Sequence, residues 1–180
     1  MTSQTKKILV VSAVVLILLS TTMAVGAKAV ELIKRFEADD INKYLRAYID
    51  PVGIATIGYG STYNYDAKRK VQLGDSITVE KAIEWLRKET KTITPQIKAL
   101  IKVPINQNQL DSLTSFVYNI GLGAFKNSTL LRLLNSGAPQ SEVAAQFDRW
   151  NKGTVNGQKV VLPGLVRRRN EEKALFLTPL

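Results

Sequence analysis

The stretch FEADDINKYLRAYIDPVGIATIGYG, residues 36–60, decides which fold and which chemistry we expect of this chain. Glu37 ends an apolar pattern with helical spacing, and Asp50 stands directly before a proline, which disfavours helix. Thr56 lies in an alternation of small and β-branched residues that is typical of a strand. Several glycines in the same stretch permit tight turns. The stretch therefore predicts a helix followed by a small antiparallel hairpin, with a carboxylate on each.

Two residue types are missing from the whole sequence, because it contains no Cys and no His. Their absence excludes zinc sites built on thiolate or imidazole, Cys–His and Ser–His–Asp machinery, and disulfides. Carboxylates, hydroxyls and amides must then carry any catalysis. Two carboxylates on separate elements fit glycoside hydrolysis, in which one acid protonates the leaving oxygen and the other carboxylate activates water or attacks the sugar. The alternative is that Glu37 and Asp50 are solvated surface residues.

A resemblance favours catalysis. The run YLRAYIDPVGIATIGYGST at 44–62 resembles the signature of phage-type lysozymes, glycoside hydrolase family 24. Further matches follow in the family's order, and together they cover roughly residues 28–178: SFVYNIGLGAFKNSTLLRLLN at 115–135, RWNKG at 149–153 and LPGLVRRRNEE at 162–172. The resemblance implies that Glu37 is the catalytic acid, with Asp50 and Thr56 as its partners. It also implies that the saccharide cleft is lined by Tyr118, Asn119 and Ser128, and it implies no cofactor or metal.

The sequence departs from the family pattern near the expected acid. Twelve residues separate Glu37 from Asp50, where the family usually has eight. Asp39 and Asp40 in this longer link are the alternative acids, although Glu37 keeps the family's place at the end of the helix. The residue after Glu37 is Ala38 instead of Gly, and Ser61 stands where the family has His.

Residues 1–27 predict a membrane segment. Lys6 and Lys7 precede residues 8–27, a run without a charge that would span ~30 Å as a helix, about one hydrocarbon core. The flanking lysines indicate that the N-terminus stays inside. Three fates remain open: a cleaved signal peptide, a permanent anchor, or a signal-arrest-release segment like those of some phage endolysins that the chain resembles. We favour release, because Ser, Thr, Ala and Gly dilute the apolar run.

The rest of the chain, residues 28–180, predicts one lysozyme-like α+β domain that is mostly helical. We expect a first helix within 28–49, interrupted or extended at 38–43, and a small antiparallel β region over 50–75. A long helix over 78–102, kinked or divided at Pro95, would join this β lobe to a helical C-terminal lobe over 106–180. That lobe carries an Asn-Gly hairpin pattern at 155–158. Residues 167–169, three arginines, are a solvated face or, by the resemblance, lie near the cleft.

Charge indicates the kind of partner. The formal net charge is +10 at pH 7, which suits an anionic polymer such as a cell wall. Nucleic acid is the competing polyanion, but no nucleic-acid-binding motif is present and export argues against it. We therefore expect a monomer without a nucleic-acid partner that contacts the bacterial inner membrane through residues 8–27.

The function that we predict is an endolysin muramidase acting on the glycan strand of peptidoglycan. It would be exported across the host inner membrane, tethered there, and then released to the periplasm. One alternative is a lytic transglycosylase of related fold, which uses a single acid and makes an anhydro product. The other is a non-catalytic, membrane-anchored protein that only binds the wall.

Overall fold

The computed structural model describes residues 26–155 and 157–180, so most of the predicted segment 1–27 lies outside the described residues. The elements, in chain order, are α2 Ala27–Glu37, the 3₁₀ turn η1 Ile41–Tyr44, β1 Tyr48–Ile49, β2 Ala55–Thr56, β3 Tyr63–Asn64, β4 Arg69–Lys70, α3 Val79–Leu100, α4 Gln107–Ile120, α5 Leu122–Lys126, α6 Thr129–Asn135, α7 Gln140–Ala145, the 3₁₀ turn η2 Gln146–Trp150, β5 Lys152–Val155, β6 Gln158–Val161 and α8 Pro163–Leu177. None of the helices in the described ranges has the length and apolar character needed to cross a membrane.

Helix α2 carries the predicted acid at its last residue. Val30 and Ile33 are buried against α3, as their spacing predicts, whereas Phe36 is only partly buried. The helix ends at Glu37 because Ala38 turns to extended backbone, with φ of −148°. A continuous helix through residue 43 is therefore wrong, and interruption is the correct alternative: Asp40 accepts a hydrogen bond from the backbone N–H of Asn42 and opens the short turn η1.

The β lobe consists of two short antiparallel strand pairs, β1–β2 and β3–β4. In the first pair Tyr48 lies opposite Thr56, which fixes the register of the hairpin that carries Asp50. Beneath this lobe, Ile57 packs with Trp85 in a small apolar cluster. The predicted antiparallel β region is confirmed.

The long connecting helix α3 begins after Thr78, whose hydroxyl accepts a hydrogen bond from the backbone N–H of Lys81. It runs unbroken through Pro95, so of the two predicted outcomes there the division is wrong, and the kink stays a prediction. Proline costs the helix one backbone hydrogen bond. Burial of Ile97 in the core of the helical lobe, where it is 0% exposed, offsets that loss and keeps the second half of the helix in place.

The helical lobe has one apolar core in which Phe116 of α4 meets Phe147 of η2, with ring centroids 4.8 Å apart. Asn106 and Gln109 form a capping box at the start of α4, and Ser128 caps α6. Pro163 stands at the first turn of α8, the last helix. The predicted helical C-terminal lobe is thus confirmed.

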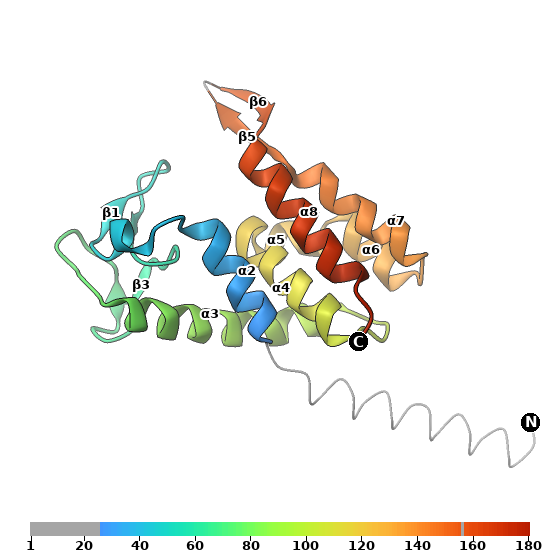
Figure 1. Cartoon of the computed structure of the whole chain (residues 1–180), viewed down its shortest axis with the longest axis horizontal. Helices are drawn as coiled ribbons and strands as arrows, with labels where there is room; N and C mark the ends of the chain where they lie inside the picture. The colour runs from blue at the N-terminus through green and yellow to red at the C-terminus, as the bar shows by residue number, and fades with distance from the viewer. Residues whose placement is uncertain (1–25, 156) are drawn as a thin grey trace, which may run out of the picture.

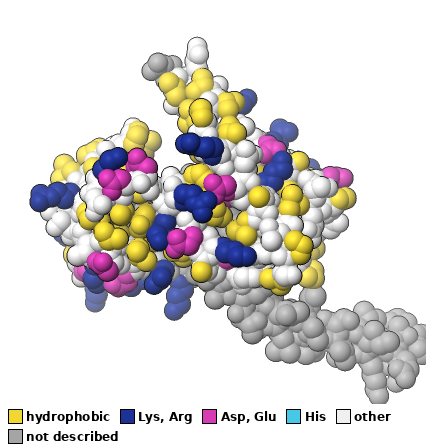
Figure 2. Space-filling view, in the orientation of Figure 1, with side chains coloured by type: hydrophobic (Ala, Val, Ile, Leu, Met, Phe, Trp, Pro, Cys, Tyr) yellow, Lys and Arg dark blue, Asp and Glu magenta, His cyan; other side chains and the backbone are white. Residues whose placement is uncertain are grey.

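The two lobes stand apart and are joined by α3 along one side (Figure 1). Helix α2 lies between them, and its end at Glu37 is directed toward the β lobe. The β5–β6 hairpin projects from the helical lobe beside the start of α8 (Figure 1). The surface is hollowed between this hairpin and the β lobe (Figure 2).

Candidate active site

Glu37 lies at the junction of the two lobes and presents its two oxygens to different partners. Oε1 is 2.6 Å from Nη1 of Arg168 on α8, and the side chain keeps 23% of its surface exposed. Oε2 faces Gly60, where an added Cβ would lie 3.7 Å from Oε2 and 4.0 Å from the hydroxyl of Tyr118. Gly60 has φ of +93°, which also favours glycine there. One oxygen is thus fixed by a cation, and the other is available to a ligand.

Arg168 is itself held by a buried network. Its Nε lies 3.0 Å from Oε1 of Glu172, and its Nη2 donates to the carbonyl oxygen of Ser115 at 3.1 Å. Both Arg168 and Glu172 are almost completely buried, so the guanidinium has little freedom to move. The network fixes the position from which Arg168 contacts Glu37.

Arg169 extends the same network toward Asn119. Its Nε lies 2.8 Å from Oε2 of Glu172, and its Nη2 donates to Oδ1 of Asn119 at 3.0 Å. Burial lowers the pKa of Arg169 to about 10, so it is still charged at neutral pH. Arg167, by contrast, is exposed. The three arginines therefore divide between the two predictions: one is a solvated residue, and two belong to the interior of the site.

Asp50 and Thr56 are positioned by the same turn of the β1–β2 hairpin. Oδ1 of Asp50 accepts hydrogen bonds from the backbone N–H groups of Val52 and Ile54, at 3.0 and 2.8 Å. The hydroxyl of buried Thr56 donates to the carbonyl oxygen of Ile54 at 3.1 Å. Oδ2 of Asp50 receives no hydrogen bond from any described residue, which leaves it available to water.

Tyr48 indicates that the two carboxylates share one neighbourhood. Burial raises the pKa of its phenol, and the nearby Tyr44, Glu37 and Asp50 raise that pKa further. Because the negative charges of both Glu37 and Asp50 act on this phenol, Tyr48 lies near both carboxylates. The end of α2 and the β1–β2 hairpin therefore both lie near Tyr48.

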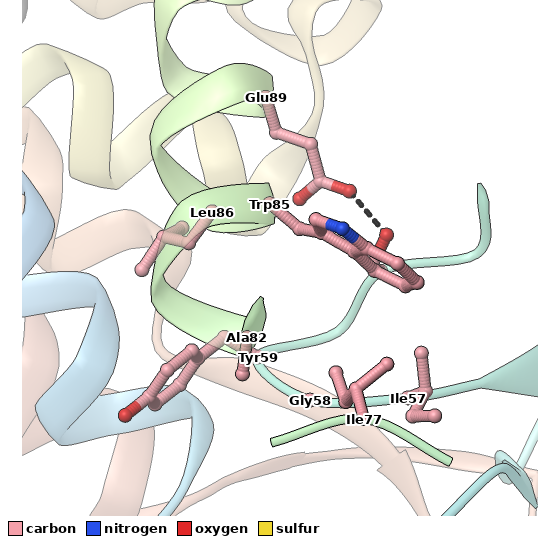
Figure 3. Close-up of a pocket in the computed structure, with 9 residues that line it drawn as sticks. Ile57, Gly58, Tyr59, Ile77, Ala82, Trp85, Leu86 and Glu89 are labelled. Atoms are coloured by element: carbon pink, nitrogen blue, oxygen red, sulfur yellow. Dashed lines mark hydrogen bonds between the residues drawn. The ribbon is translucent and has the colours of Figure 1, made fainter. Parts of the chain in front are cut away.

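Glu89 on α3 is a member of this site that the sequence analysis missed. The Tyr118 hydroxyl lies 2.7 Å from Oε2 of Glu89 and 2.8 Å from the carbonyl oxygen of Tyr59. Oε1 of Glu89 lies 2.5 Å from the hydroxyl of Ser61, the residue that stands where the family has His. Figure 3 shows this contact above Trp85. The sequence offered one signal, which is that Ser61 stands where the family has His. A serine hydroxyl makes different hydrogen bonds from an imidazole, so the residue that contacts this position must differ in its own hydrogen bonding.

Three residues singled out from the sequence lie outside this cluster of contacts. Ser128 is buried, and its hydroxyl accepts from the backbone N–H of Leu131, so its visible role is to cap α6. Asp39 is exposed and pairs with Lys43 at 3.2 Å, while Asp40 is exposed and opens η1. Among the described residues, no group of acidic side chains is placed to hold a metal ion.

Comparison with known families bears directly on this geometry. The family model described as phage lysozyme matches residues 42–172, which is most of the chain. The chain belongs to the phage lysozyme family. The matched region contains the β1–β2 hairpin, all of α3 and the Arg168–Glu172 network.

Known relatives agree with this assignment. An endolysin of Acyrthosiphon pisum secondary endosymbiont phage 1 is 44% identical over 154 residues, which cover 86% of this chain and 98% of that protein. A SAR-endolysin of Pseudomonas phage phiKMV is 38% identical over 133 residues, 74% of this chain and 78% of that protein. The solved muramidase domain of SpmX from Asticaccaulis excentricus superposes with a TM-score of 0.74 at 38% identity and covers 87% of this chain and 99% of that domain.

Proposed function

We propose that this chain is an endolysin muramidase that hydrolyses the β-1,4 bond between N-acetylmuramic acid and N-acetylglucosamine in peptidoglycan and so lyses the host cell. Membership of the phage lysozyme family supports a glycoside hydrolase, and the endolysin and muramidase relatives support peptidoglycan as its substrate. One observation carries the catalytic assignment: Glu37 has one oxygen fixed by buried Arg168 and the other turned toward Gly60 at the junction of the lobes.

Glu37 is the general acid in this proposal. A proton on Oε2 passes to the glycosidic oxygen as the bond to the leaving sugar breaks. The negative charge that then develops on the carboxylate is stabilised by the Arg168 guanidinium, which is already in place 2.6 Å from Oε1. Asp39 and Asp40 are weaker candidates, because both are exposed and engaged in local contacts of the link.

Asp50 and Thr56 bind and activate the attacking water. The hairpin turn holds Oδ1 of Asp50 and leaves Oδ2 to accept a proton from water, while the Thr56 hydroxyl oxygen can accept a second hydrogen bond. Attack on the face opposite the leaving group inverts the anomeric carbon. An inverting enzyme needs carboxyl groups roughly 6.5–9.5 Å apart to admit that water. Tyr118, Asn119 and Ser128 would line the saccharide cleft, Tyr118 and Asn119 through contacts shared with the site.

The nearest alternative is a lytic transglycosylase, which would need no activated water. The hairpin-positioned Asp50 and Thr56 favour hydrolysis. End-group analysis separates the two: a muramidase leaves reducing ends, whereas a transglycosylase leaves anhydro ends.

A turbidity assay on purified cell walls tests the proposal. The full chain should clear the suspension, and Glu37→Gln should lower the rate at least ~10²-fold with unchanged circular dichroism. Asp39→Asn and Asp40→Asn are matched controls that should lyse normally. Near-normal lysis by Glu37→Gln, with either control inactive, assigns the acid elsewhere. A wild-type chain that binds walls without clearing them is a non-catalytic wall-binding protein.

We further propose that residues 8–27 tether the enzyme to the inner membrane before its release to the periplasm. Similarity to SAR-endolysins and the diluted apolar run support this localisation. Glu37 lies ten residues after Ala27, only ~15 Å along a helix, so the tethered form should be inactive. Leucines at Ser20, Thr21 and Thr22 should delay lysis. Cells are fractionated before and after an uncoupler: lysis while full-length protein stays in the membrane overturns release, and a soluble form cut near Ala27 indicates a signal peptide.

A further inference from the structure

Four short oxygen–oxygen contacts meet around Glu89. Its Oε1 lies 2.5 Å from the Ser61 hydroxyl, which is also 2.9 Å from the carbonyl oxygen of Tyr63. Its Oε2 lies 2.7 Å from the Tyr118 hydroxyl, which is also 2.8 Å from the carbonyl oxygen of Tyr59. Contacts this short between oxygens require a hydrogen between them.

A count of protons decides the state of Glu89. The two backbone carbonyls only accept, so the Ser61 and Tyr118 hydroxyls bring two protons to four contacts. With Glu89 ionised, two contacts are left with lone pairs facing each other. With a proton on Oε1, Glu89 donates to Ser61, Ser61 donates to Tyr63, and Tyr118 shares its proton between Oε2 and Tyr59. The protonated form thus supplies three protons to the four contacts and needs only Tyr118 to share its proton, whereas the ionised form supplies two and needs both hydroxyls to do so, which makes the protonated form the better match.

The surroundings of Glu89 agree with this count. Within residues 26–155 and 157–180, no Lys or Arg forms an ion pair with it. It lines a cavity too tight for a water molecule, together with Trp85, whose indole N–H has no hydrogen-bond partner (Figure 3). Burial raises the pKa of Glu89 and outweighs the hydrogen bonds with Ser61 and Tyr118, which lower it, and the negative charge of Glu37 on α2 adds to the rise.

The other ionisable groups that face this cluster come from three elements. Tyr118 of α4 donates to Glu89, and Tyr65 of the β lobe lies close enough that Glu89 raises its pKa. Arg168 of α8 acts on Tyr118, but its own contacts go to Glu37, Glu172 and Ser115. Its charge is thus committed to the carboxylates of Glu37 and Glu172.

We propose that Glu89 is held as a neutral carboxylic acid and acts as a positioning residue that fixes the Tyr59–Ser61 segment beside Glu37. Its contacts join α3 to both ends of that segment, to Ser61 directly and to Tyr59 through Tyr118. Gly60, between those ends, forms the wall that faces Oε2 of Glu37. A neutral Glu89 builds this wall without placing a second negative charge next to Glu37. The link to catalysis rests on the proposed role of Glu37; the protonation state does not.

Unfolding equilibria of the full chain test the protonation state. A raised folded-state pKa gives stability that is complete below the unfolded pKa, about 4.3, and is lost as pH rises through the folded value. The ratio of folding constants, wild type over Glu89→Gln, should therefore fall by up to tenfold per pH unit over that window. The exposed Glu142→Gln is the control and should show no such tenfold fall. A ratio for Glu89→Gln that stays flat or rises with pH overturns the proposal.

Infrared spectra provide a measurement that does not need Glu89→Gln to fold. The wild type should keep the carbonyl band of a protonated carboxyl group at pH values where ordinary glutamates are ionised. Ser61→Ala removes the acceptor of that proton and should shift the band. Absence of the band, or a band that Ser61→Ala leaves unchanged, contradicts a neutral Glu89 bonded to Ser61.

Wall lysis tests the positioning role. Gln matches the length and the donor–acceptor pattern of a neutral Glu, whereas Asp keeps the acid but is too short to reach both Ser61 and Tyr118. Glu89→Gln should therefore retain more lysis than Glu89→Asp. The opposite order would show that Glu89 acts through its charge and would overturn the proposal. The unfolding and infrared results do not depend on whether Glu37→Gln abolishes lysis. A failure of the neutral Glu89 proposal can therefore be told apart from a failure of the proposed catalytic role of Glu37.

Discussion

Removing the Arg168 guanidinium is the perturbation whose effect follows most directly from the structure. Arg168→Met keeps the length and apolar stem of the side chain but deletes its contacts to Glu37, Glu172 and Ser115. The neighbouring Arg167 is exposed, so Arg167→Met changes the net charge equally without touching the site.

The expected loss of unfolding free energy follows from the contacts that Glu37 and Glu172 lose. Breaking a buried ion pair by removing one member costs roughly 3–5 kcal/mol, because the other charge stays buried. Glu172 keeps Arg169 and Ser115, and Glu37 is 23% exposed and can be hydrated, so the lower end applies, about 3 kcal/mol. For a domain of this size, that corresponds to roughly 6–12 °C in Tm.

Urea unfolding of both variants measures this difference, with the slope of the transition checked for constancy. Arg167→Met should lie within about 0.5 kcal/mol of wild type. Equal stabilities for the two variants would refute the reasoning, since they would mean that the buried network contributes no more than a surface charge.

Three further predictions concern other parts of the fold. Asp111→Ala should lower the free energy of unfolding by about 1 kcal/mol and speed amide hydrogen exchange in α2. The reason is that Oδ1 of Asp111 accepts a hydrogen bond from the Gly26 N–H, at a helix start that has no side-chain cap of its own. Unchanged exchange would contradict this. Arg69 holds the pKa of Asp75 well below its usual range, so Asp75 contributes stability above its unfolded pKa that is lost as pH falls; unfolding of wild type against Asp75→Asn between about pH 5 and 2 should show that loss only in wild type. Phe147→Ala, at a site that is 0% exposed, should lower the unfolding free energy by about 3–5 kcal/mol in urea titrations, and a loss under about 1 kcal/mol would place Phe147 outside the core.

Local signals explain why so much of the fold was predictable. The starts of α3, α4 and α6 follow from Thr78, Asn106 and Ser128, whose side chains bond backbone groups within three residues. The division predicted at Pro95 is wrong because the local cost of proline was weighed without the burial of Ile97, which offsets it.

The candidate catalytic residues could be named from the sequence because they lie in one short stretch. Glu37, Asp50 and Thr56 occur within twenty residues and share a recognisable pattern. Nothing in the sequence around Glu89 distinguishes it from any other glutamate on a helix. Its role in the site comes from contacts with Ser61 and Tyr118, which the fold brings to it from two other parts of the chain. Arg168 likewise stands in a run of arginines, and only tertiary packing separates the buried ones from exposed Arg167.

The central claim is that Glu37 protonates the glycosidic oxygen while water, activated at Asp50, completes the hydrolysis. Digestion of purified peptidoglycan in water labelled with heavy oxygen tests this claim most directly, with the muropeptides reduced at once and analysed by mass spectrometry. Wild-type enzyme should place one heavy oxygen at each new reducing end, and Glu37→Gln should release no such ends above background. Unlabelled anhydro ends, or labelled ends from Glu37→Gln at the wild-type rate, would contradict the account.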